Sequence, residues 1–133
     1  MLEKVKKLIQ QNDRLGRLLG VELLEVGEGS AVARLTVTDD HLNAADVVHG
    51  GAVFTLADIA LAAASNSFGD IALLTNGNIT VFHATTEGDT LTARAEEVSK
   101  SRKLGHYRVA VFNGAEEQVA VFNASVYRTG KPF

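Results

Sequence analysis

The segment from Gly50 to about Ser67 constrains the fold more than any other part of the chain. It is rich in Ala with Leu, Ile and Phe and lacks the two-residue alternation of a strand, which predicts a helix of four to five turns. Because this helix is apolar on nearly every side, it must be mostly buried. The stretch from Ala52 to Ala64 is interrupted by Thr55 and Asp58, and it falls short of the ~20 residues that span a bilayer. We therefore expect a sheet that wraps around the helix.

Six other segments have the composition or alternation of strands. In the second of them, Ala33, Leu35 and Val37 point to one face and the intervening residues to the other. The segments are Val21–Val26, Ala31–Val37, Ile71–His83, Thr90–Ser99, Gly105–Phe112 and Gln118–Tyr127. The pair Asn113-Gly114 marks a turn between two antiparallel strands. Consecutive antiparallel strands with segregated helices indicate an α+β fold.

The first nineteen residues have helical spacing. Leu2, Val5 and Leu8 recur every three residues, and Asn12 or Asp13 can cap a second short helical turn. The 133 residues fit one domain, in which residues 1–19 are an N-terminal helical segment.

Composition excludes several classes of protein. With 13 basic and 16 acidic residues the net charge is −3, which argues against a dedicated nucleic-acid binder. The absence of Cys excludes disulfides, thiolate metal sites and a Cys nucleophile. The N-terminus lacks the apolar core of a signal peptide, so we expect a cytoplasmic protein with no membrane association.

The start of the apolar helix carries the most chemistry. Two glycines, Gly50 and Gly51, let another molecule approach a helix N-terminus whose first N–H groups have no intrahelical partner, a suitable place for an oxyanion. Asp58 follows two turns later, where a carboxylate is costly unless it is paired or used. His49 precedes the glycines, and Asn43 lies in the preceding polar loop.

Each of these residues also has a structural interpretation. The glycines can serve helix entry or close packing, and Asp58 can accept hydrogen bonds from a neighbouring loop. His49 can cap the helix, and His41 and Asn43 can bond within their own loop. His41, His49 and Asp58 match no metal-ligand spacing, so we predict no metal site.

Taken together, the segment resembles the PaaI-type family of hotdog-fold acyl-CoA thioesterases. The family pattern is Asn, six residues, His-Gly-Gly, and then Leu-Ala-Asp on the helix, and it fits Asn43, His49-Gly50-Gly51 and Leu56-Ala57-Asp58 in register. Further likeness runs from Leu15 to the closing segment. The resemblance implies about six antiparallel strands around one central helix, and a homotetramer built as a dimer of dimers.

The resemblance also implies a reaction and its residues. An acyl-CoA thioester, with an aryl or medium-length acyl group, would be hydrolysed without a cofactor at the dimer interface. The Gly50 N–H would polarise the carbonyl, and Asp58 of the other subunit would attack it or activate water. Asn43 and His49 would position the carbonyl or the water. Gly51, Thr75 and Asn76 would lie against the substrate.

Two positions depart from the family pattern. Asp46 stands where the family commonly has Gly, and Asp tolerates left-handed backbone geometry better than most residues. His83-Ala84 stands where the family often has Arg-Pro, so no CoA-phosphate contact is carried over to that position.

Charge is unevenly distributed along the chain. Residues 20–97 contain 2 basic and 12 acidic residues, whereas Lys100, Arg102 and Lys103 follow within a predicted turn. This turn could hold the phosphates of CoA. It could equally be a solvated turn that protects a strand edge.

Three functions are compatible with these residues. The first is an acyl-CoA thioesterase that depends on Asp58. The second is a noncatalytic hotdog module that binds acyl-CoA, which has no need of a carboxylate facing the thioester. The third, a dehydratase acting on acyl-carrier-protein substrates, lacks the Pro/Gly-rich His motif expected of it.

Overall fold

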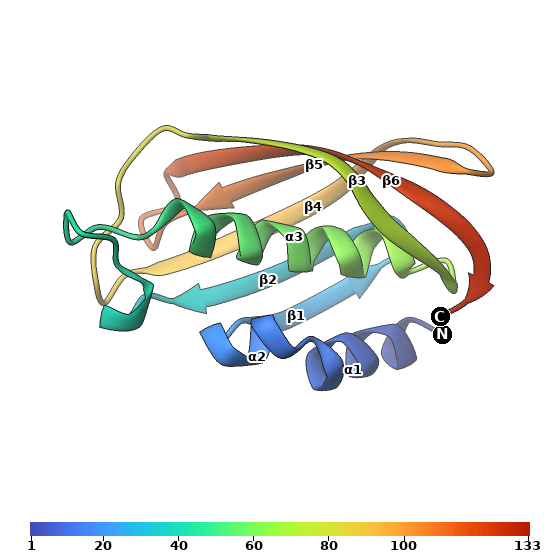
Figure 1. The fold of residues 1–133 in the computed structure, drawn as a ribbon, viewed down its shortest axis with the longest axis horizontal. Coiled ribbons are helices and arrows are strands. Elements are labelled where there is room, and N and C mark those ends of the chain that lie inside the picture. Colours follow the sequence, from blue (N-terminus) through green and yellow to red (C-terminus); the bar gives the residue numbers. More distant parts are fainter.

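The computed structural model describes residues 1–133 and consists of one curved antiparallel sheet, one long helix against its concave face and two short helices at one side (Figure 1). The helices are α1 (Leu2–Asn12), α2 (Arg14–Leu19) and α3 (Gly50–Asn66). The strands are β1 (Glu22–Gly27), β2 (Ser30–Thr36), β3 (Asp70–Val81), β4 (Thr90–Lys100), β5 (Leu104–Phe112) and β6 (Gln118–Pro132). The hotdog arrangement implied by the resemblance is confirmed.

The core lies between α3 and the concave face of the sheet. The predicted inward set Ala33, Leu35 and Val37 is buried. Alanines line the sheet as well as the helix, so the two backbones can approach closely. None of the helices combines the length and apolarity needed to cross a membrane.

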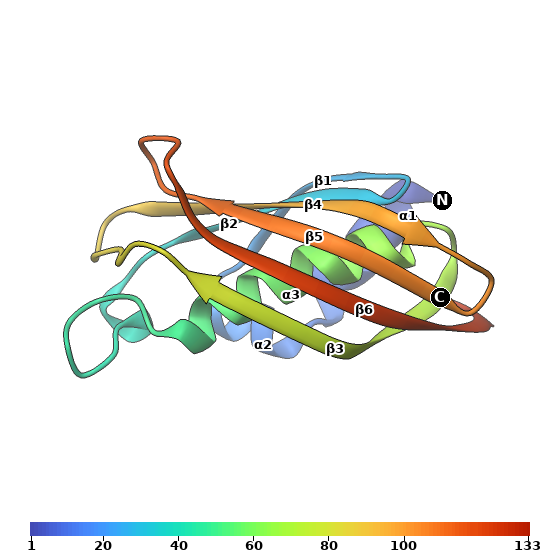
Figure 2. The ribbon, with the colours of Figure 1, turned by 90° about the horizontal axis from the view of Figure 1, so that it is seen from above.

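The strand order is β1-β2-β4-β5-β6-β3, so β1 and β3 are the two edges. Seen from above, β3 lies at one border of the sheet, and α3 crosses beneath the strands (Figure 2). β3 follows directly after α3 and runs back toward its N-terminal end. The start of β3 therefore lies at the C-terminal end of α3.

The edge at β1 is closed by the N-terminal helices. The Gln10 side chain donates to the Val21 carbonyl at 3.2 Å and accepts from the Leu23 N–H at 2.6 Å. By contrast, β3 has no strand on its outer side, and Leu73 and Phe82 are about half exposed. An open apolar edge of this length is a template for pairing with another strand.

Strand boundaries differ most from the sequence prediction at β6. The strand continues to Pro132, whereas alternation predicted an end at Tyr127. The extra residues pair with the beginning of β3, where Asp70 lies opposite Pro132. That pairing is a tertiary contact, so no local pattern signals it.

Candidate active site

The loop before α3 is folded around the side chain of Asn43. Its Oδ1 accepts from the N–H groups of Ala45, at 2.9 Å, and Val47, at 3.4 Å. Asp46 has a φ of 62°, which confirms the left-handed conformation expected where the family has Gly. The Asn43 oxygen is thus used within the loop, and its amide N–H₂ remains available as a donor.

His49 is the N-cap of α3. Its Nδ1 accepts from the Gly51 N–H at 2.8 Å, which fixes the neutral tautomer that carries its proton on Nε2. The cap confirms the structural interpretation of His49 and leaves Nε2–H as an exposed donor. It also takes up the Gly51 N–H in this structure, so that group is not free for a substrate.

Gly50 supplies the free donor at this helix end. Its N–H has no hydrogen-bond acceptor within the chain, whereas the next N–H groups are bonded to the side chain or carbonyl of His49. A Cβ placed at Gly50 would meet no atom within 4 Å, so nothing inside this chain requires glycine there. A ligand or a second chain that approaches closely would supply such a requirement.

His41 anchors the loop to α2 and to α3. The buried imidazole accepts from the Thr38 N–H at 2.9 Å through Nδ1 and donates to the Leu19 carbonyl at 2.7 Å through Nε2. The His41 carbonyl accepts from the His49 N–H at 2.7 Å. His41 is therefore the loop hydrogen-bonder considered from the sequence, and it sets the position of His49.

Asp58 lies on the face of α3 that the sheet does not cover. It shares this face with Thr55 and Ala62, whereas Leu61 and Ser65, three and seven residues after Asp58, are buried. Burial raises the pKa of the Asp58 carboxyl, and the negative charge of Asp13 raises it further. No hydrogen bond or ion pair within the chain compensates the Asp58 carboxylate.

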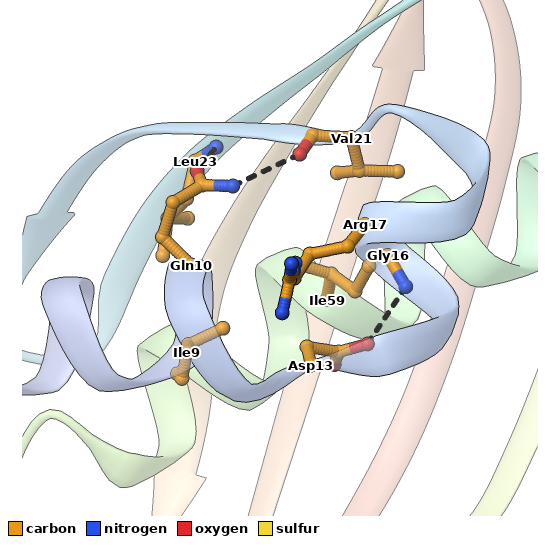
Figure 3. Close-up of a pocket in the computed structure, with 8 residues that line it drawn as sticks. All are labelled: Ile9, Gln10, Asp13, Gly16, Arg17, Val21, Leu23 and Ile59. Carbon is orange, nitrogen blue, oxygen red and sulfur yellow. Dashed lines mark hydrogen bonds between the residues drawn. The ribbon is translucent and has the colours of Figure 1, made fainter.

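Asp13 comes from the junction of α1 and α2 (Figure 3). Its Oδ1 accepts from the Gly16 N–H at 2.8 Å, which confirms the predicted cap. Gly16 packs so closely on Ile59 that a Cβ there would lie 2.6 Å from the Ile59 side chain. This contact places the Asp13 carboxylate beside α3. The sequence signalled the cap, but no local pattern signalled the proximity to Asp58.

Gly50 and Asp58 of one chain do not converge. Eight residues separate them along a helix, which corresponds to about 12 Å of axial rise. A hydrogen-bond donor and a nucleophile or base must each lie within about 3 Å of their targets on the same thioester. One chain alone therefore cannot bring both groups to one carbonyl.

Thr75 and Asn76 lie in the middle of β3. The register with β6 shifts between Leu74 and Asn76, so Thr75 is the extra residue of a bulge. Its hydroxyl donates to the Ser125 carbonyl at 3.2 Å. Both side chains are exposed at the open edge of the sheet.

The basic turn lies at the other end of α3 from Gly50. Lys100 and Arg102 line an open cavity of about 750 Å³ together with Phe68 and Arg128, whereas Lys103 is not part of its lining. The Lys100 ammonium lies 4.0 Å from the centre of the Phe68 ring. Sequence reasoning missed Arg128, whose buried guanidinium pairs with Asp70 at 2.6 Å and keeps Nη1 without a partner.

No three His, Asp or Glu side chains come together in a way that could hold a metal ion. The chemical groups at hand are the free Gly50 N–H, the donors of His49 and Asn43, and the uncompensated Asp58 carboxylate. A backbone donor at a helix N-terminus and a carboxylate with raised pKa suit attack on a carbonyl.

Residues 45–120 match the family model described as the thioesterase superfamily. A protein of Archaeoglobus fulgidus is 43% identical over all of this chain and 86% of its own length. Escherichia coli acyl-coenzyme A thioesterase PaaI is 36% identical over 90% of this chain and 86% of its own.

Solved structures agree with the sequence relatives. The structure of E. coli PaaI superposes with a TM-score of 0.95, covering 98% of this chain and 95% of that one at 33% identity. A Streptococcus mutans protein, solved with acetyl CoA bound, superposes with a TM-score of 0.81 at 27% identity, covering 85% of this chain and 91% of that one. The chain therefore belongs to the thioesterase superfamily and is a PaaI-type thioester hydrolase with the hotdog fold.

Proposed function

We propose that the protein hydrolyses acyl-CoA thioesters to a free acid and CoA, with Asp58 and the Gly50 N–H as its central groups. The observation that carries the proposal is the open face of α3, where an unused N–H and an uncompensated carboxylate occur on an otherwise apolar helix. PaaI of E. coli and the acetyl CoA complex from S. mutans support the CoA thioester as substrate.

Two copies of the chain are needed to assemble the site. The free edge of β3 can pair with β3 of a second copy about a two-fold axis. β3 runs antiparallel to α3, so this pairing places the Gly50 end of one α3 beside the C-terminal half of the other. Gly50 of one copy and Asp58 of the other can then flank one thioester. We further propose that two such dimers form a homotetramer.

The proposed reaction begins with the thioester carbonyl accepting a hydrogen bond from the Gly50 N–H. Asp58 of the second copy then removes a proton from water as the water oxygen attacks the carbonyl carbon. The bond to sulfur breaks, and the CoA thiolate leaves and takes up a proton. In the alternative route the Asp58 carboxylate attacks directly, and water hydrolyses the resulting anhydride. Single turnover in ¹⁸O water separates the routes. Attack by water puts one ¹⁸O into the first acid released, whereas direct attack followed by addition of water at the Asp58 carboxyl carbon releases unlabelled acid and leaves the ¹⁸O in Asp58.

The remaining site residues orient the reactants. We propose that the His49 Nε2–H and the free Asn43 amide donate to the carbonyl or the water. Thr75 and Asn76, exposed at the β3 edge, would lie near the attacking water of the paired copies. Gly51 contributes by permitting close approach, because its N–H is bonded to His49.

The basic turn serves the substrate of the other copy in this arrangement. It lies at the C-terminal end of its own α3, and edge pairing brings that end toward Gly50 of the second copy. Lys100 and Arg102, with Lys103 beside them, would bind the phosphates of CoA. The double variant Lys100→Gln, Arg102→Gln should have a higher KM for acyl-CoA and a nearly unchanged kcat.

The competing function is a noncatalytic module that binds acyl-CoA. A thiol-release assay over short, medium, long and aryl acyl-CoA substrates separates the two. Turnover that falls by orders of magnitude in Asp58→Asn supports the enzyme. Tight binding of acyl-CoA with no turnover for any substrate would support the module.

Light scattering of the same samples measures the oligomeric state, and we expect four copies. We also propose that the residues 1–133 act as one domain, in the cytoplasm.

A further inference from the structure

Arg128 carries the single buried side-chain nitrogen of the protein that has no hydrogen-bond partner. The side chain is 7% exposed, and its Nη2 pairs with the Asp70 carboxylate at 2.6 Å, whereas Nη1 meets no acceptor. A buried charged donor without a partner is destabilising, so native proteins seldom keep one unless a ligand or a water completes it. The fork of a guanidinium allows one nitrogen to hold Asp70 while the other holds a second anion.

Arg128 is part of the wall of the open cavity beside the basic turn, whose volume is about 750 Å³. The charged residues of the lining are Asp70, Lys100, Arg102 and Arg128, which give the cavity a net charge of +2. The whole chain, by contrast, has a net charge of −3. Because Asp70 is already paired with Arg128, the cavity attracts anions, and its charge balances that of a dianion.

Phe68 contacts two of these cations. The Lys100 ammonium lies 4.0 Å from the centre of the ring, and the guanidinium carbon of Arg128 lies 5.2 Å from it. Lys100 is exposed, and its ammonium sits on a flexible stem. A charge-assisted contact with an anion is stronger than an exposed contact with a ring, so a bound anion can recruit Lys100 with no change in the backbone.

The burial of Arg128 selects the kind of anion. A phosphodiester or a pyrophosphate continues as a chain on both sides, so it brings its oxygens less close to a recessed donor than a terminal group does. A phosphomonoester is a terminal group with three acceptor oxygens and a charge of about −1.5 to −2 at pH 7. That charge matches the net +2 of the lining. In CoA the phosphate on the ribose 3′ oxygen is a phosphomonoester, whereas the pyrophosphate is not.

From these observations we infer that the cavity is a site for a phosphomonoester dianion, with Arg128 Nη1 as the buried donor and Lys100 and Arg102 as the outer cations. In the proposed dimer the site lies toward Gly50 of the second copy, because Arg128 is paired with Ala72 near the start of β3. The 3′-phosphate of the CoA thioester is the ligand that fits this place. The inference rests on the proposed function, and it makes Arg128 a specificity residue that distinguishes CoA from handles that lack the 3′-phosphate.

Inorganic phosphate has the same chemistry, and a substrate without the 3′-phosphate separates the two sources. For the unmodified protein, kcat/KM for octanoyl-CoA should exceed that for octanoyl-3′-dephospho-CoA about 10- to 100-fold, since a charge-assisted contact is lost. The difference should lie in KM with kcat nearly unchanged. The contact is remote from the carbonyl and therefore equally strong in the ground state and the transition state.

Arg128→Lys tests the buried donor. Lysine keeps the charge that pairs with Asp70 but has no second fork nitrogen for the anion, so the preference for octanoyl-CoA should fall about 10-fold. Arg94→Lys is the matched control and should keep the preference of the unmodified protein. Arg94 also pairs with a carboxylate, that of Glu116 at 3.1 Å, and lies 4.6 Å from the centre of the Phe112 ring, but it lines no part of the cavity.

Calorimetry measures the same site without turnover. Adenosine 3′,5′-bisphosphate contains the 3′-phosphate, and 5′-AMP lacks it, so the unmodified protein should bind the bisphosphate at least about 10-fold more tightly. Inorganic phosphate is titrated in the same way. If Arg128→Lys does not fold, the double variant Lys100→Gln, Arg102→Gln takes its place, because both side chains are exposed. It should reduce the difference between the two nucleotides.

The outcomes separate this inference from the proposed function. If the protein cleaves no acyl-CoA but binds the bisphosphate through Arg128, the site stands and the proposed function is wrong. If the two octanoyl substrates are cleaved equally and inorganic phosphate binds in a way that depends on Arg128, the site takes free phosphate. If the 3′-phosphate changes neither binding nor kcat/KM and inorganic phosphate does not bind, the inference is overturned.

Discussion

The two faces of α3 differ in burial and in whether their polar groups have partners within the chain. The face toward the sheet is built from residues such as Leu56, Ala60 and Leu61, all of them buried. The open face presents Asp58 and, at its start, the Gly50 N–H, and neither has a partner within the chain. One face thus completes the fold of a single molecule, whereas the other is left for a substrate and a second copy.

The largest expected effect of breaking this contrast comes from Asp58→Asn. Removing the carboxylate eliminates the base or nucleophile, so we expect kcat to fall by at least about 10³-fold. The thiol-release assay with octanoyl-CoA measures this loss. Unchanged turnover in the folded variant would remove Asp58 from the mechanism.

The same substitution should stabilise the fold. Because the folded-state pKa of Asp58 lies above its ordinary value, stability decreases as pH rises from the ordinary pKa of Asp through the raised one. Asp58→Asn should therefore have a higher Tm than the unmodified protein at pH 7. The difference should shrink as pH falls below the raised pKa, and equal Tm values at pH 7 would contradict this account.

Gly50→Pro tests the other group on the open face. Proline is favoured at the first position of a helix, and His49 already has the extended backbone that must precede proline, so the fold should persist. The substitution deletes the N–H, and kcat should fall about 10²- to 10³-fold. Gly50→Ala, which keeps the N–H, should retain more activity. Equal activity of the two variants would argue against an oxyanion donor at this position.

The sheet-facing side should respond in the opposite way. Leu56→Ala removes a fully buried side chain and should lower the free energy of unfolding by about 2–5 kcal/mol. Below its reduced Tm the variant should keep kcat/KM within about twofold, because Leu56 faces away from the reacting groups. A large loss of kcat in the folded variant would show that the two faces are not separable.

The smallest effect is expected from Asp13→Asn. Asparagine keeps the cap on α2 and removes the charge that raises the pKa of Asp58. In the pH dependence of kcat/KM, the acid limb should then move to lower pH, and the plateau value of kcat/KM should change little. Glu3→Gln, on the first turn of α1, serves as the charge-matched control and should leave the limb in place.

Much of this architecture could be predicted from the sequence, because its signals are local. The apolar run predicts α3, and alternation places the strand cores. Asn43, the His49-Gly50-Gly51 run and Asp58 mark the chemistry. Their predicted catalytic roles stay predictions until the variants are measured.

The remaining features depend on contacts between distant segments. The bulge at Thr75 and the extension of β6 arise from strand pairing, and the approach of Asp13 to Asp58 arises from the packing of Gly16 on Ile59. No periodicity in the sequence reports contacts of this kind.

The central claim is that Gly50 of one copy and Asp58 of another serve one thioester, and mixing two inactive variants tests it most directly. When equal amounts of Gly50→Pro and Asp58→Asn are refolded together, half of the two-fold dimers contain one chain of each. Each mixed dimer has one site with both groups intact, so the mixture should recover about a quarter of the unmodified activity. Activity no greater than that of the two variants refolded separately, in a sample shown to contain mixed dimers, would contradict the account.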